Sequence, residues 1–168
     1  ALSNHSKGIE DNKKLTEVDF TAYQTYDSAL VIGGGPNAAN HSDAMIEWLK
    51  RNPKTAIVHA SSKNALYYRA IDRKHHFCLI GNEGHRLESI FGNLEGMDAV
   101  CILPPYPRKM GTYIPRMLEK NAFELKGISF SDLYQDAHTA IALQTVLELG
   151  VNNIFVAGYD GYSSNNMT

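Results

Sequence analysis

Residues 30–37 read Leu-Val-Ile-Gly-Gly-Gly-Pro-Asn, an apolar run that stops on three glycines and leads into a segment with helical spacing. A strand that ends on glycines and turns at once into a helix is typical of parallel sheets, where the turn brings backbone N–H groups to the strand end. Doubly wound α/β folds bind phosphate and carboxylate groups at this place. This run therefore predicts an α/β domain with a ligand site after its first buried strand.

Apolar runs of strand length recur along the chain and alternate with stretches of helical period. The predicted strands cover residues 29–32, 55–60, 76–80, 99–103, 122–125 and 153–157. The first predicted helix begins at a capping oxygen on Asn40 or Ser42 and runs to about residue 51. A short helix is predicted after residues 61–64, and two further helices are predicted over about 114–119 and 133–149. This alternation predicts a Rossmann-like three-layer α/β/α sandwich with a mostly parallel sheet. We assign this domain to residues 29–168, and residues 1–28 to a polar connecting arm.

Composition limits the classes of function. The 168 residues carry a net charge of −2, which supplies no cationic field for nucleic acid or an anionic membrane surface. The longest apolar runs are strand-sized, so no membrane span is expected. No secretory signal begins the chain, and we expect a cytoplasmic protein in which Cys78 and Cys101 are small core residues. The chain lacks an initiating Met and ends in a polar string, which favours a fragment of a longer protein.

The glycine loop is the first candidate ligand site, through Gly33, Gly34, Gly35 and Asn37. Its spacing matches the dinucleotide-binding pattern, although Pro36 removes one N–H donor. The second predicted strand ends without an acid that could hold a ribose hydroxyl. In its place stand residues that can receive a phosphate: Ser61, Ser62 and Lys63.

Two further loops follow predicted strands. The first carries Asn82, Glu83, His85 and Arg86, which suit acid–base work or an anion, or else form a capped helix start with charges facing solvent. In the second, Asp160 either accepts hydrogen bonds from a ligand hydroxyl or closes its own turn. The adjacent His75 and His76 point to opposite faces of a strand, so no metal site is predicted from them. The sequence also shows no familiar nucleophile motif.

Several of these loops together resemble one family. The residues concerned are 31–36, 81–88, 103–105 with 110–112, 140–150 and 155–162. They are similar to the C-terminal Rossmann-like domain of aldolases related to 4-hydroxy-2-oxovalerate aldolase and to HMG-CoA lyase. The resemblance implies a parent lyase whose N-terminal TIM barrel holds a divalent metal and performs the aldol chemistry. It implies for this chain an accessory domain that binds a small anionic or nucleotide-like ligand, with the barrel as its partner and without aldolase activity of its own.

A second resemblance leaves an alternative open. A strand that ends in glycines and proline, together with a late Gly-Tyr-Asp sequence at 158–160, is also similar to the sialyltransferase-like and pterin-pyrophosphokinase-like groups of Rossmann proteins. That resemblance implies a transferase that uses a nucleotide donor.

Overall fold

The computed structural model describes residues 8–10, 26–80, 83–91, 98–105, 112–125 and 137–159. Six strands form one sheet in the order β7-β5-β4-β3-β2-β8, and every neighbouring pair is parallel. The strands are β2 (Ser28–Ile32), β3 (Thr55–His59), β4 (His75–Cys78), β5 (Ala99–Leu103), β7 (Ala122–Glu124) and β8 (Asn153–Ala157). Each predicted strand is present with bounds shifted by at most two residues, and the predicted Rossmann-like α/β fold is confirmed.

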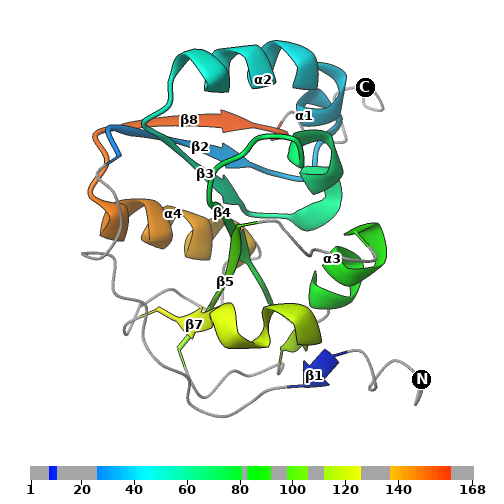
Figure 1. The fold of residues 1–168 in the computed structure, drawn as a ribbon. Coiled ribbons are helices and arrows are strands. Elements are labelled where there is room, and N and C mark those ends of the chain that lie inside the picture. Colours follow the sequence, from blue (N-terminus) through cyan, green and yellow to red (C-terminus); the bar gives the residue numbers. More distant parts are fainter. Residues whose placement is uncertain are drawn as a thin grey trace, which may run out of the picture.

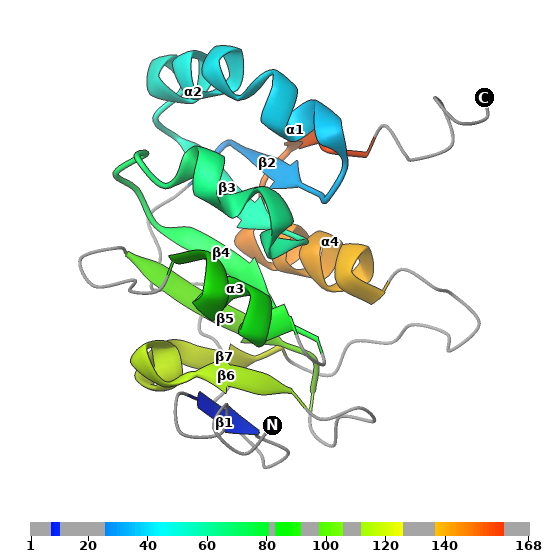
Figure 2. The ribbon, with the colours of Figure 1, turned by 90° about the vertical axis from the view of Figure 1, so that its right-hand side faces the viewer.

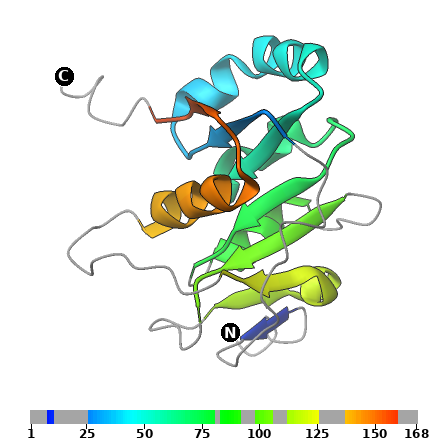
Figure 3. The same cartoon turned by 90° about the vertical axis from the view of Figure 1, so that its left-hand side faces the viewer.

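Helices cover the two faces of the sheet unequally (Figure 1). The helical elements are α1 (Pro36–Asn40), α2 (Ser42–Arg51), η3 (Ser62–Tyr68), α3 (Glu83–Phe91), η4 (Arg116–Asn121) and α4 (Ala137–Leu149). Figure 2 shows η3, α3 and η4 in front of the sheet, whereas Figure 3, from the opposite side, shows α4 in front. Right-handed connections explain this arrangement, because the chain crosses the sheet in one direction from β2 to β7 and returns through α4 to β8.

The core consists of one apolar layer on each face. Alternate residues of β2 show the division: Ala29 and Val31 pack with Ile141 and Val146 of α4. Leu30 and Ile32 pack on the other side with helical residues that include Leu49 and Tyr68. Strands buried on both faces read as continuous apolar runs, which is why the sequence revealed them.

Both cysteines are buried core residues, as predicted. Cys78 packs on the α4 face, and Cys101 packs on the opposite face with Phe77 and Leu103. Burial raises the pKa of the Cys101 thiol well above its usual range. Burial keeps both thiols away from solvent.

The helix predicted over about 114–119 begins too early. Ile114 lies in the short strand β6 (Tyr113–Pro115), and η4 begins at Arg116. The reason is Pro115, because a residue that precedes proline is pushed into extended conformation. β6 pairs antiparallel with β1 (Gly8–Glu10), so part of the predicted connecting arm forms a strand.

The helical segment after the glycine loop is also different from the prediction. α1 begins directly at Pro36, which stands at a first helical position. His41 separates α1 from α2, and neither Asn40 nor Ser42 caps α2 with its side chain, so that predicted cap is wrong. α2 ends at Arg51, where the sequence Asn52-Pro53 stops it as expected.

Within the described segments, no helix combines the length and the apolar character that crossing a bilayer requires.

Candidate ligand site at the carboxyl end of β2

The glycine loop lies where the strand order of the sheet departs from chain order. β2 is flanked by β3, which follows it in sequence, and by β8, the last strand. Because β2 and β8 are parallel neighbours, the loop after β2 meets the loop after β8 at the carboxyl ends of the two strands. In open α/β sheets, ligands bind in such crevices outside the carboxyl ends of the strands.

Two of the glycines hold the loops together. The Gly33 N–H donates to the Ala157 carbonyl at 2.7 Å, and the Gly35 N–H donates to the Gly158 carbonyl at 2.6 Å. A Cβ on Gly33 would lie 2.8 Å from the Gly158 oxygen, and Gly158 itself has a φ of +79°. These two N–H groups are used within the protein, so Gly33 and Gly35 serve the packing of the loops.

Asn64 of η3 holds the glycine loop through two hydrogen bonds. Its buried side-chain amide donates to the carbonyls of Gly33 and Gly35, each at 2.9 Å. Sequence reasoning missed this residue. The available signal was a polar side chain in the short helical segment after β3, which gives no sign that it points toward the glycine loop.

Gly34 differs from its neighbours because it faces the loop after β3. A Cβ at this position would lie 3.3 Å from Ser61 Oγ and 3.7 Å from Lys63 Cδ. Ser61 caps η3 by accepting a hydrogen bond from the Lys63 N–H at 3.2 Å. Within the described residues the Gly34 N–H donates no hydrogen bond to protein. The structure thus brings together a bare backbone segment, a hydroxyl and an exposed lysine, whereas the predicted Ser62 is buried.

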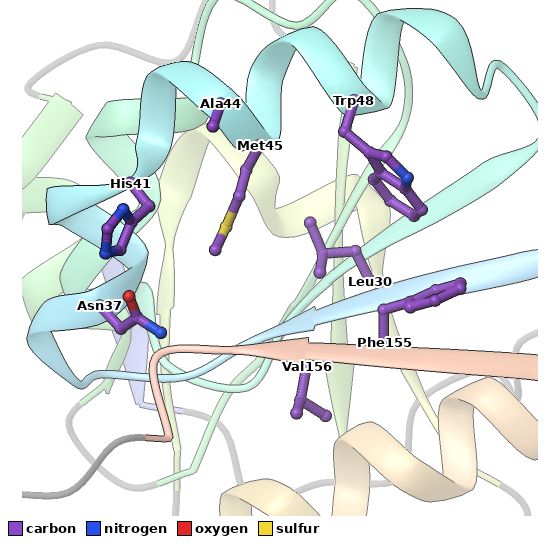
Figure 4. Close-up of a pocket in the computed structure, with 8 residues that line it drawn as sticks. All are labelled: Leu30, Asn37, His41, Ala44, Met45, Trp48, Phe155 and Val156. Atoms are coloured by element: carbon purple, nitrogen blue, oxygen red, sulfur yellow. The ribbon is translucent and has the colours of Figure 1, made fainter.

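An apolar groove lies between α2 and the strands β2 and β8, and Asn37, three residues after Gly34, is part of its lining (Figure 4). Its volume is about 490 Å³, and it is lined by Leu30, Asn37, His41, Ala44, Met45, Trp48, Phe155 and Val156. Asn37 and His41 form a polar end near the strand termini, and the rings of Trp48 and Phe155 meet edge to face at 4.9 Å farther along. The sequence identified Asn37 alone, because the groove depends on β8 lying beside β2.

The predicted residues of α3 belong to another cluster. The ring of His85 stacks on Tyr113 of β6 at a centroid distance of 3.4 Å. The Tyr113 hydroxyl donates to Glu88 at 3.1 Å, and desolvation, followed by this carboxylate, raises the pKa of Tyr113 to about 12. Arg86 is exposed on the same helix. The structure places Glu83 at the start of α3, while Asn82 and Asp160 lie outside the described residues.

Three buried histidines lie in neighbouring strands of the sheet, His59 in β3 and His75 and His76 in β4. His75 and His76 contact different partners on opposite faces, as predicted: His75 stacks on His59, and His76 bonds the Ile57 carbonyl near Tyr26. Burial lowers the pKa of all three imidazoles, that of His76 to about 4. Across the described part of the chain, no three His, Cys, Asp or Glu side chains are grouped so that they could hold a metal ion.

Comparison of the chain with protein-family models, curated proteins and solved structures finds no match to any of the three.

Proposed function

We propose that this domain binds a small nucleotide-like ligand at the carboxyl end of β2. Its phosphate is held by Gly34, Ser61 and Lys63, and its planar apolar part occupies the groove. The observation that carries the proposal is the approach of Gly34 to both Ser61 and Lys63, together with a groove whose polar end begins at Asn37, three residues further along the chain. In open α/β sheets, ligands bind at the loops that follow the carboxyl ends of the strands.

The phosphate end relies on side chains more than on the glycine loop. Two loop N–H groups are used internally, and Pro36 has none. The ammonium of Lys63 supplies the charge, and a charge-assisted hydrogen bond contributes about 1.5–3 kcal/mol. The absence of a side chain on Gly34 leaves room for phosphate oxygens beside Ser61.

The apolar end suits a planar ring. Ligand sites are lined mainly by apolar and aromatic side chains with a few polar groups that set orientation. Trp48, Met45 and Phe155 supply the apolar lining, and Asn37 and His41 supply the polar groups. A base or similar heterocycle therefore fits the groove better than a flexible sugar.

In relation to the resembled aldolases, we propose that this domain contributes binding and that aldol cleavage belongs to the barrel of the parent protein. The isolated chain should then show no retro-aldol cleavage of a 4-hydroxy-2-oxo acid with added Mg²⁺ or Mn²⁺. Measurable cleavage that depends on the metal would contradict this division.

Fluorescence offers a direct test, because Trp48 is the only tryptophan in the chain and lines the groove. Titration with adenosine monophosphate should change its emission and raise the melting temperature, since a ligand of the native state stabilises it. Inorganic phosphate should raise the melting temperature with a smaller change in emission. Acyl-CoA compounds and sugar nucleotides extend the same titration.

Two variants separate the two ends of the site. Lys63→Ala should weaken binding of adenosine monophosphate and of phosphate about tenfold or more. Ala44→Arg, which fills the groove, should weaken the nucleotide and spare phosphate. Lys50→Ala, on the exposed side of α2, is the matched charge control. The proposal fails if no nucleotide binds, or if Lys63→Ala and Lys50→Ala behave alike.

A further inference from the structure

The last strand of the sheet, β8, exposes apolar side chains along an open edge. Within the described residues it pairs with β2 on one side only. Ile154, Phe155 and Val156 expose 43%, 46% and 59% of their surfaces. Open edges are usually protected by lysine, proline or a bulge, and the sequence Asn-Ile-Phe-Val-Ala has none of these. The edge is therefore free of the features that prevent a further strand from pairing.

The exposed residues lie on both faces of β8. Ile154 and Val156 are in register with Ala29 and Val31, which face α4. Phe155 is in register with Leu30, which faces α2. Figure 4 shows Phe155 and Val156 pointing to opposite sides of the strand. An occupant must therefore continue the sheet in its own plane, because a helix laid on one face would leave the other exposed.

α4 extends this apolar surface. Thr139 bonds the hydroxyl of Tyr159, just after β8, at 3.1 Å, so the side of α4 that carries Thr139 points toward β8. Leu143 and Leu147 follow at intervals of four residues on the same side of the helix and are 40% and 65% exposed. We call Leu143, Leu147, Ile154, Phe155 and Val156 the β8 strip.

We propose that the β8 strip binds a second copy of this chain, with the two β8 strands paired antiparallel about a two-fold axis to form one continuous sheet. A two-fold contact requires a surface that complements itself. With the axis at Phe155, Ile154 of one copy stands opposite Val156 of the other, and no charged residue lies in either strand. Apolar residues then meet apolar residues on both faces.

The size of the surface agrees with this occupant. The five residues of the strip expose on the order of 100 Å² each. If the contact covers all of this area in both copies, it buries about 1,000 Å², which is the lower limit for a specific interface. The main-chain hydrogen bonds between the two strands are additional. The second copy would also close the open side of the groove beside Phe155.

Sedimentation velocity of the full chain over a wide range of concentration tests the proposal without any ligand, so its result is independent of the proposed function. We expect a species of twice the chain mass. Val156→Lys, which places a charge on the open edge, should give the monomer with an unchanged circular dichroism spectrum. Leu66→Lys is the matched control, because Leu66 is 51% exposed on η3, away from β8. A wild-type monomer at every concentration overturns the proposal, as does equal behaviour of the two variants.

Cross-linking tests the register. Phe155→Cys places two thiols opposite each other across the axis, at a separation that a disulfide can bridge. Mild oxidation should therefore give a covalent dimer, whereas Leu66→Cys should not. The native Cys78 and Cys101 are buried and do not compete. A dimer that forms in solution but does not cross-link through residue 155 rules out the proposed pairing.

Discussion

The Nε2 atom of His59 lies 3.0 Å from the Nδ1 atom of His75, and both imidazoles are fully buried. Nε2 of His75 lies 3.0 Å from the Ile71 carbonyl, to which it can only donate. Nδ1 of His75 must then accept a hydrogen bond from the Nε2–H of His59, so His75 is neutral with its proton on Nε2, and His59 also carries a proton on Nε2. A proton added to His59 would sit on Nδ1, which has no hydrogen-bond partner in the described residues.

We predict that the free energy of unfolding falls on acidification from pH 7 to pH 5. The pKa values of His59, His75 and His76 are lowered from 6.5 in the folded state, chiefly by burial, so unfolding takes up protons below pH 6.5. Each histidine removes up to about 1.4 kcal/mol per pH unit below 6.5, until its folded pKa is reached. Their stabilising contribution is complete above pH 6.5.

Urea denaturation at the two pH values measures this effect. Around the cluster, Lys74 and Arg73 oppose protonation while Asp98 favours it. His41→Gln, at an exposed position between α1 and α2, is a control that should keep the wild-type difference. Equal midpoints at pH 7 and pH 5 would show that the three buried histidines are not held neutral.

The strands could be predicted because burial on both faces requires continuous apolar runs, such as residues 29–32. The site could be predicted only as a set of loops. Gly33 and Gly34 are adjacent residues of the same type, yet Gly33 packs on Gly158 and Gly34 faces Ser61. That difference depends on the loops after β8 and β3, which local sequence does not specify. The groove between Trp48 and Phe155 likewise joins residues from distant segments.

Gly33→Ala should destabilise the fold, whereas Gly34→Ala should not. A methyl at position 33 would lie 2.8 Å from the Gly158 carbonyl oxygen, and a backbone group cannot move aside easily. We expect a loss of about 1–3 kcal/mol from this crowding. At position 34 the nearest atom is the Ser61 hydroxyl at 3.3 Å, and the change should stay within about 1 kcal/mol. Urea denaturation of both variants should rank them in this order, and the reverse order would contradict the loop packing.

Asn64→Asp should destabilise more than Asn64→Ala. Alanine removes two buried hydrogen bonds to Gly33 and Gly35, which we expect to cost about 2–3 kcal/mol. Aspartate places a carboxylate against the same two carbonyl oxygens and adds repulsion to that loss. Thermal denaturation near neutral pH measures both, with Asn40→Asp on exposed α1 as the control. An aspartate variant as stable as wild type would mean that the amide does not support the glycine loop.

Arg73→Lys should destabilise the protein although the charge is kept. The Arg73 guanidinium donates to the Leu49 carbonyl at 2.7 Å and to the Thr55 carbonyl at 2.9 Å, and so joins the end of α2 to the start of β3. A third contact, to the Asn52 carbonyl, measures 3.3 Å. The planar fork of arginine reaches these acceptors together, and an ammonium on a flexible stem cannot.

We expect Arg73→Lys to lower the free energy of unfolding by about 1–3 kcal/mol, because at least one half-buried carbonyl loses its hydrogen-bond donor. Arg51→Lys provides the matched control, since Arg51 is exposed on the last turn of α2 and its replacement should change stability by less than about 0.5 kcal/mol. Hydrogen exchange adds a local measurement, because release of the end of α2 should speed exchange at Asn52 and Thr55, whose amides bond to Leu49 and Asn52. If both lysine variants unfold at the same urea concentration, the charge near α2, and not the guanidinium geometry, is what stabilises this end of the helix.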